Sequence, residues 1–261
     1  MAGAMIENVG VQLFTVRKYT RTPDALEATL RKLHEMGYSR FELARLRFSP
    51  EELAVLKRLK AELGLVYTVS QIKLKVIQKR LDWLIEFSKT LGIGYIEVSV
   101  IPMKAFLGGE KGLRALAAEL NALGAQLKER GVSLLYHHHN FELIRLGDRL
   151  GIDILLAETD RRYVNLVADT YWIARSGIHP GDFIERRAER IGGIHLRDCQ
   201  YRFRGLRFVF NDCAVGDGTV DFGFLARLSG RFMSVEQATE QPFEMLQRSR
   251  AALERLLGQQ V

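Results

Sequence analysis

The sequence predicts an α/β fold, a (β/α)₈ barrel of the TIM type, built by one domain that spans residues 1–261. Eight short runs rich in β-branched and aromatic residues alternate with amphipathic segments and glycine-containing turns. Eight such units fit the ~250 residues that typically close this barrel. A doubly wound open sheet normally carries a glycine-rich phosphate turn after its first strand, and Thr15–Tyr19 contains no glycine there. The barrel is therefore the predicted fold.

The predicted strands are apolar with little alternation, which is typical of a parallel sheet covered by helices. In chain order they are Val9–Val16, Arg40–Ala44, Leu65–Ile72, Tyr95–Ile101, Val132–His139, Tyr163–Ala168, Ile191–Leu196 and Phe232–Gln237. Leucines three or four positions apart predict the intervening helices, as in Pro23–Met36 and Glu51–Leu63. Glycine follows several of these helices, for example Gly37 and Gly64, at the position where a left-handed residue ends a helix.

The composition is that of an ordinary globular protein, with 47% hydrophobic and 26% charged residues. No stretch approaches the ~20 uninterrupted apolar residues that a membrane-spanning helix needs. Residues 1–5 lack the basic start and the apolar run of a signal peptide, so we expect a cytoplasmic protein. Cys199 and Cys213 belong to no C-x-x-C pair and are expected to be reduced, unreactive thiols.

The formal net charge of +7 favours acidic ligands and permits nucleic acid. The basic residues are scattered over the predicted helices, apart from one cluster formed by Arg197, Arg202, Arg204 and Arg207. A scattered excess is typical of a solvated surface, so we expect neither a nucleic-acid partner nor a membrane. Exposed barrel faces often pair, which leaves a homo-oligomer open.

Polar residues lie where the predicted strands end, and in these barrels the active site is built at the C-terminal ends of the strands. They are Gln12, Glu42, Gln71, Glu97, the segments 136–142, 169–172 and 195–198, and Glu236 with Gln237. The last four strands thus offer a carboxylate or histidine cluster, an aspartate, a histidine and a glutamate. Such a set suits one divalent ion, Mn²⁺ first, with Mg²⁺, Co²⁺ and Zn²⁺ as alternatives. Each residue alone has a structural reading too, such as a helix N-cap for Asp169 or a core residue for His195.

Several segments resemble the motifs of the sugar phosphate isomerase/epimerase family, whose fold is shared with xylose isomerase. Residues 136–142 (Y-H-H-H-N-F-E) resemble that family's Y-H-N-H-D-F-E, and residues 169–175 (D-T-Y-W-I-A-R) resemble its D-T-Y-W-V-A-R. Residues 194–198 are similar to its H-L-K-D, residues 215–221 to its V-G-E-G-x-I-D turn, residues 235–237 to its V-E-Q, and residues 10–17 to its first strand. The sequence departs from the pattern at His138 and Asn140, and in a basic, aromatic loop over Cys199–Asp212.

The resemblance implies that Glu142, Asp169, His195 and Glu236 hold the metal. Strand alternation bears on the first of these, because alternate residues of a strand point to opposite faces and this separates Glu142 from His137 and His139. Glu142 turns toward the mouth independently only if the strand ends near His139. His137 is its substitute as a ligand.

The implied reaction is proton transfer next to a carbonyl by a sugar, keto-sugar or cyclitol isomerase or epimerase, in which a divalent cation stabilises an enediolate. The predicted acid/base residues are Glu142, Glu236, His139 and His137, and the predicted substrate contacts are Glu97, Trp172, Arg197 and Gln12. Structural alternatives are a histidine network at 137–139, a buried paired carboxylate at Glu97, packing at Trp172, and for Arg197 an ion pair with Asp198 or another acidic neighbour. The loop over 199–212 either reads an anionic or planar substrate or is simply exposed, and 216–218 is a predicted turn before a helix that leads into the last strand.

Other functions stay open at this point. An inosose-type dehydratase or lyase would use the same site. An apurinic endonuclease needs several metals, and outside residues 137–139 the chain has only His34, His179 and His195. A non-catalytic sugar-binding barrel is the last alternative, although a lost activity would not preserve all four predicted ligands.

Overall fold

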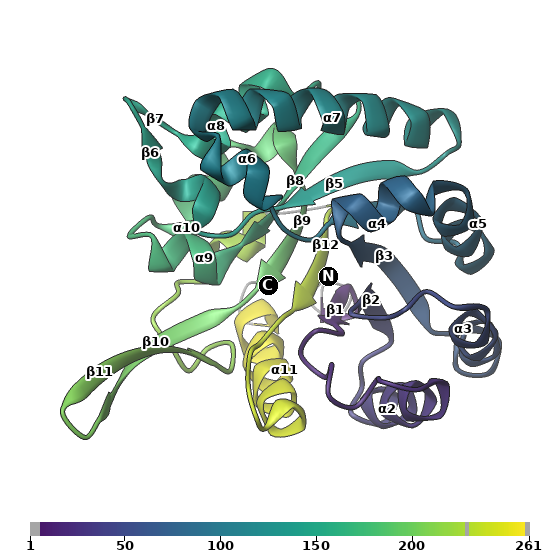
Figure 1. The fold of residues 1–261 in the computed structure, drawn as a ribbon. Coiled ribbons are helices and arrows are strands. Elements are labelled where there is room, and N and C mark those ends of the chain that lie inside the picture. The colour runs from purple at the N-terminus through teal and green to yellow at the C-terminus, as the bar shows by residue number, and fades with distance from the viewer. Residues whose placement is uncertain (1–5, 228–229, 259–261) are drawn as a thin grey trace.

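Eight parallel strands form a closed barrel in the computed structural model, which describes residues 6–227 and 230–258 (Figure 1). The strands are β1 (Val9–Gln12), β2 (Arg40–Ala44), β3 (Val66–Ile72), β4 (Tyr95–Val98), β5 (Ser133–His137), β8 (Val164–Asp169), β9 (Ile191–Leu196) and β12 (Phe232–Val235). They follow one another around the barrel in this order, and β12 pairs with β1 to close it. The predicted (β/α)₈ fold is confirmed, and each predicted strand overlaps one of these, although β1, β4, β5 and β12 end two to four residues earlier than predicted.

Helices lie outside the barrel and cover its strands (Figure 1). They are α2 (Pro23–Glu35), α3 (Pro50–Leu63), α4 (Leu74–Lys79), α5 (Leu81–Leu91), α6 (Met103–Leu107), α7 (Gly109–Glu129), α8 (Gly151–Glu158), α9 (Thr170–Arg175), α10 (Pro180–Arg186) and α11 (Pro242–Gly258), with 3₁₀ turns η1 (Phe141–Leu143), η2 (Ala188–Arg190) and η3 (Gly223–Arg227). Ser49 and Glu52 form a capping box that starts α3, and Gly64 ends it at φ 67°. Within the described ranges, no helix has the length and apolar character needed to cross a bilayer.

Apolar side chains fill the barrel below the strand ends. Val69, Leu135 and Val167 form a buried cluster with Phe232, each from a different strand. Gly193 makes room for the aromatic ring, because a Cβ at this position would lie 2.1 Å from Cζ of Phe232. Two residues further along these strands the same inward-facing positions carry polar side chains, since strand residues alternate between faces. The packed layer is therefore the floor of a polar site.

The segment predicted as a loop over Cys199–Asp212 is instead an antiparallel hairpin of β10 (Asp198–Arg204) and β11 (Arg207–Cys213), which projects from the barrel (Figure 1). Aromatic residues at every second position give it a strand pattern, as in the facing pair Tyr201 and Phe210. Gly205 has φ 61° in the two-residue turn, where a type II′ hairpin requires a positive φ at its first central residue. The loop prediction was wrong, because the alternating side chains and the glycine turn allow this segment to pair with itself as a hairpin. A shorter hairpin, β6 (Arg145–Leu146) with β7 (Arg149–Leu150), precedes α8.

Candidate active site and metal centre

A cavity of about 610 Å³ opens at the C-terminal ends of the barrel strands. Its lining includes Gln12 after β1, Gln71 on β3, His137 on β5, Arg197 after β9 and Glu236 after β12. This is the mouth at which the sequence placed the site, and a cavity of several hundred Å³ is the size that small-molecule ligands occupy.

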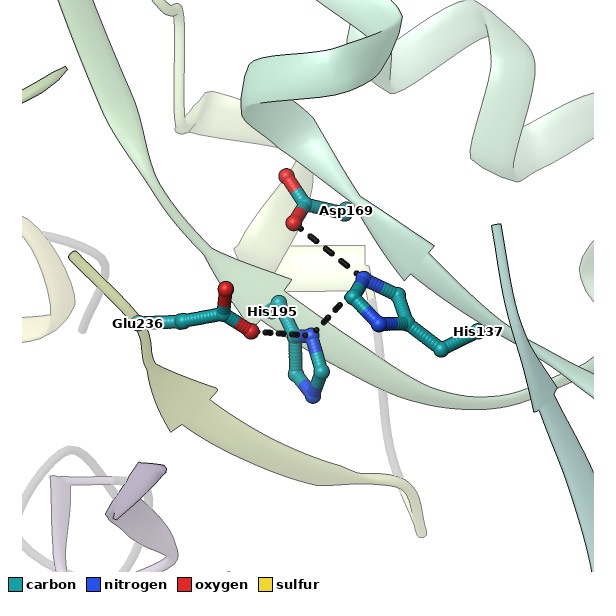
Figure 2. A group of neighbouring side chains, drawn as sticks. All are labelled: His137, Asp169, His195 and Glu236. Carbon is teal, nitrogen blue, oxygen red and sulfur yellow. Dashed lines mark hydrogen bonds and ion pairs between the residues drawn. The ribbon is translucent and has the colours of Figure 1, made fainter. Parts of the chain in front are cut away.

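Four buried side chains converge beside this cavity: His137, Asp169, His195 and Glu236 (Figure 2). Two of them, His137 and Glu236, line it directly. Each offers one ligand atom, and these atoms all lie within 4.8 Å of one another. Nε2 of His137 lies 3.3 Å from Oδ2 of Asp169 and 3.3 Å from Nδ1 of His195. Nδ1 of His195 in turn lies 3.0 Å from Oε2 of Glu236. Parity explains the convergence, because the four residues come from inward-facing positions at the ends of β5, β8, β9 and β12.

Asp169 has both of the roles that the sequence left open, a helix N-cap and a side chain that faces the cluster. Its Oδ1 caps α9 by accepting the backbone N–H groups of Tyr171 and Trp172, at 2.9 and 3.3 Å. Its Oδ2 faces the cluster and accepts from Nη1 of Arg197 at 3.0 Å. The helix cap therefore fixes the orientation of the carboxylate that points into the site.

His195 is held between two carboxylates. Its Nε2 lies 2.9 Å from Oε2 of Glu42 on β2, opposite the nitrogen that faces Glu236. Burial by itself disfavours an imidazolium here, but the charges of Glu42 and Glu236 outweigh it and raise the pKa of His195 well above its ordinary value. A carboxylate on the far nitrogen of a metal-binding histidine is the usual arrangement that orients such a ligand.

Arg197 supplies the compensating charge at the mouth. It is buried, and its Nη1 donates to Oδ2 of Asp169 and to Oε1 of Glu236, both at 3.0 Å, while Nη2 donates to Asp212 at 2.9 Å. Burial raises the pKa of both carboxyl groups, but the guanidinium charge dominates with the nearby imidazoles. The pKa of Asp169 lies well below its usual range and that of Glu236 falls to about 2. Both are therefore ionised at neutral pH.

Glu142 lies apart from this cluster. β5 ends at His137, and Glu142 follows on η1, fully buried. Its Oε1 accepts from the Tyr136 hydroxyl at 2.5 Å and its Oε2 from the backbone N–H of His139 at 2.9 Å. The geometry thus places His137, the named substitute, among the other three predicted ligands, and turns Glu142 toward the neighbouring backbone.

The three adjacent histidines have different environments. His138 donates from Nδ1 to the His139 carbonyl (3.1 Å), while its Nε2 accepts the Asp169 N–H (3.1 Å), which assigns it a structural role. His139 lines the cavity, and its Nδ1 has no hydrogen-bond partner among the described residues. Burial, together with the charge of His137, lowers the pKa of His139 to about 3, so its imidazole is neutral at physiological pH.

The predicted substrate contacts divide into two groups. Gln12, Trp172 and Arg197 line the cavity, and Gln12 also donates to Oε2 of Glu236 at 3.1 Å. Glu97 lies beneath, fully buried, where Oε1 accepts from Gln71 at 2.9 Å. Burial and the charge of Glu42 raise the pKa of Glu97 well above its ordinary value.

Two acidic residues gained no role from the sequence. Glu42 is one of the polar residues at the predicted strand ends, but its partner, His195 on β9, is distant in the chain. Only the closed barrel brings the two side chains together. Asp212 lies on β11, in the segment for which the sequence predicts a loop. The hairpin register could have indicated its role. It pairs Asp212 with Cys199, which follows Arg197 by two residues, and so brings Asp212 close to Arg197.

Asp198 supports the turn that follows the hairpin rather than pairing with Arg197. Its carboxylate accepts backbone N–H groups of Cys199, Gly216, Gly218 and Val220 at 2.8 to 3.0 Å. A Cβ at Gly218 would lie 2.2 Å from that carboxylate, so only glycine fits. The turn predicted at 216–218 is present, but the short 3₁₀ turn η3 follows it in place of a full helix.

Comparisons with known proteins agree with this architecture. The family model described as the xylose isomerase-like TIM barrel matches residues 30–255. An inosose dehydratase from Clostridium perfringens is 32% identical over 105 residues, which cover 40% of this chain, and the match spans about a third (34%) of that relative's length.

Two solved structures share the fold over nearly their whole length. A sugar phosphate isomerase/epimerase from Parabacteroides distasonis superposes with a TM-score of 0.73 at 18% identity, covering 93% of this chain and 96% of that one. A xylose isomerase-like TIM barrel protein from Mycobacterium smegmatis, in complex with magnesium, gives 0.73 at 14% identity and covers 97% of each. Together with the family match over most of the sequence, these likenesses confirm the predicted resemblance: the chain belongs to the xylose isomerase-like TIM barrel family, whose members include isomerases, epimerases and dehydratases.

Proposed function

We propose that the protein is a divalent-metal-dependent isomerase or epimerase that moves a proton next to the carbonyl group of a keto sugar or cyclitol. The observation that carries the proposal is the convergence of His137, Asp169, His195 and Glu236 in one buried cluster, of which His137 and Glu236 line the cavity. Two imidazoles and two carboxylates form a donor set that suits Mn²⁺, Zn²⁺ or Co²⁺.

The arrangement also fits the dimensions of one ion. Bonds of ~2.0–2.2 Å place ligand atoms up to about 4.4 Å apart across a metal, close to the 4.8 Å within which the four atoms lie. Asp169 and Glu236 are ionised, as ligands must be, and Glu42 holds the far nitrogen of His195. A bound divalent ion would supply Lewis-acid stabilisation to the negative charge that develops on the substrate oxygens.

The remaining chemistry falls to side chains around the cavity. Glu236 reaches the cavity in its ionised form and accepts the proton from the carbon next to the carbonyl. His139 offers an unpartnered Nδ1 to the same space and exchanges a proton with the substrate on another side. The indole Nε1 of Trp172 is likewise buried without a partner among the described residues, so it is available to a substrate hydroxyl. Gln12 holds the Glu236 carboxylate in place.

An inosose-type dehydratase is the second candidate, favoured by the identity shared with the Clostridium perfringens relative. Dehydration begins with the same proton abstraction and differs afterwards, because a neighbouring hydroxyl leaves as water. The proton that Glu236 has taken from the carbon then passes to the leaving hydroxyl, so that the step releases water and leaves Glu236 ionised again.

Two measurements test the proposal. Calorimetric titration with Mn²⁺ should give one site in the wild type, and His195→Ala and Glu236→Gln should abolish it. Glu119→Gln, the same substitution at an exposed position of α7, serves as the matched control. The Mn²⁺-loaded enzyme is then incubated in D₂O with D-fructose, D-tagatose or scyllo-inosose. Deuterium next to the carbonyl without loss of water supports an isomerase or epimerase, and a conjugated, ultraviolet-absorbing product supports the dehydratase. A wild type that binds no metal would refute both.

A further inference from the structure

The cavity wall formed after β2 and β3 carries three cationic side chains. Arg45 and Arg47 lie between β2 and α3, and Lys73 lies between β3 and α4. All three are exposed and line the same cavity as Glu236. In the part of the chain that the structure describes, none of the three is in an ion pair with a carboxylate. The charge of this wall is therefore not compensated by the protein.

The backbone that presents the two arginines is strained and firmly held. Arg45 and Phe48 have φ values of 63° and 54°, in the left-handed region that residues other than glycine rarely adopt. Arg80 donates to the carbonyl groups of Arg47 and Phe48, at 2.8 and 2.7 Å, and the Trp83 indole donates to the same Phe48 carbonyl at 2.7 Å. Backbone strain that the surrounding structure enforces is concentrated at functional sites.

Charges elsewhere in the cavity add to the excess. The acidic residues of the lining, Asp212 and Glu236, both pair with Arg197, so neither is available to the opposite wall. Arg17 lies close enough that, after the effect of burial, the charge of Arg45 lowers its pKa. An anion entering beside Arg45 and Arg47 would relieve this repulsion and accept charge-assisted hydrogen bonds from two guanidinium groups.

We infer that Arg45, Arg47 and Lys73 form an oxyanion subsite, and that the substrate is a keto sugar or cyclitol carrying a phosphate or carboxylate group at the end remote from the four-residue cluster. The inference rests on the proposed function for the reacting end of the substrate. The cavity of about 610 Å³ is large enough for a six-carbon sugar together with such a group.

Calorimetry with inorganic phosphate tests the subsite directly in the Mn²⁺-treated full chain. Removing two charge-assisted contacts should weaken phosphate binding by at least about tenfold in the double variant Arg45→Gln/Arg47→Gln. Lys57→Gln removes an exposed charge from α3 outside the cavity and should leave phosphate binding unchanged. Circular dichroism and Mn²⁺ affinity should match the wild type in both variants.

Paired ligands then identify the source of the anion. D-fructose 6-phosphate and 5-keto-D-gluconate, each compared with neutral D-fructose, distinguish a phosphate from a carboxylate. Equal phosphate binding by the wild type and the double variant, or no binding of either anion in preference to D-fructose, would overturn the inference. Phosphate binding that depends on the two arginines in a protein that takes up no Mn²⁺ would support the subsite and refute the proposed function.

Discussion

Replacing Glu142 with glutamine should change the pH dependence of folding stability while leaving metal affinity intact. The resemblance to the sugar phosphate isomerase/epimerase family implied that Glu142 is a metal ligand. In the structure its two oxygens accept from the Tyr136 hydroxyl and the His139 N–H, whereas His137 faces the other three predicted ligands. We therefore expect Glu142→Gln to bind Mn²⁺ with an affinity within about twofold of the wild type.

The size of the stability effect follows from the burial of the carboxyl group. Burial raises the pKa of Glu142 to about 7 from 4.5, against the opposing hydrogen bonds from Tyr136 and His139. Because the folded-state pKa is the higher one, this group stabilises the fold at low pH, and that contribution is lost as the pH rises through 7. Between pH 5 and pH 8 the loss is about 2–3 kcal/mol.

Glutamine does not ionise, so the variant lacks this dependence. Its amide NH₂ also faces one of the two donors, which costs about 2 kcal/mol relative to the protonated carboxyl group. The wild type should therefore be more stable than the variant by about 2 kcal/mol at pH 5, and the difference should nearly vanish at pH 8. Urea unfolding in the presence of a chelator measures both values.

The control for metal binding is His137→Ala, which should lose Mn²⁺. If Glu142→Gln loses Mn²⁺ to the same degree, and its unfolding free energy varies with pH as the wild type's does, Glu142 is a ligand and the argument from its hydrogen bonds fails.

Glu42→Gln removes the carboxylate behind the histidine ligand of β9 and should weaken Mn²⁺ binding by about 10–100-fold in a calorimetric titration; unchanged affinity would contradict a positioning role. Burial raises the pKa of Cys199 to about 11 and that of Cys213 to about 12, so at pH 8 an aromatic disulfide reagent should label neither until urea unfolds the protein, and rapid labelling of the native state would oppose this. Gly193→Ala places a methyl group against the Phe232 ring and should lower the unfolding free energy by about 1–3 kcal/mol, whereas a neutral result would show that the ring can move aside.

The architecture and much of the site follow from patterns that are local in the chain. Apolar runs at regular spacing predicted the barrel strands, and the rule that active sites lie at the C-terminal strand ends selected Asp169, His195 and Glu236. These three lie together because each is at an inward-facing position of its own strand. Strand parity likewise identified His137 as the alternative to Glu142, since the period of two is fixed by the backbone.

The features of the site that could not be predicted from the sequence are side-chain orientations and long-range contacts, which the closed barrel determines. The orientation of Glu142 is decided by the 3₁₀ turn that follows β5 and by the Tyr136 hydroxyl, neither of which a strand pattern encodes. The bond between Glu42 and His195 joins positions 153 residues apart. No turn signal in the sequence marks the cationic wall, because the left-handed residues of the segment that carries Arg45 and Arg47 are not glycine.

The charges around His195 also determine how a metal would bind. Glu42 and Glu236 raise the pKa of this histidine, so without a metal its imidazole carries a proton on the nitrogen that faces Glu236. A metal ligand must be deprotonated, and a divalent ion therefore has to displace that proton. The carboxylates that favour binding of a cation thus also favour the proton that competes with it on His195. Metal affinity should therefore fall steeply as the pH is lowered. Arg197 limits the effect, because its contacts with Asp169 and Glu236 keep these two carboxylates ionised over the same range.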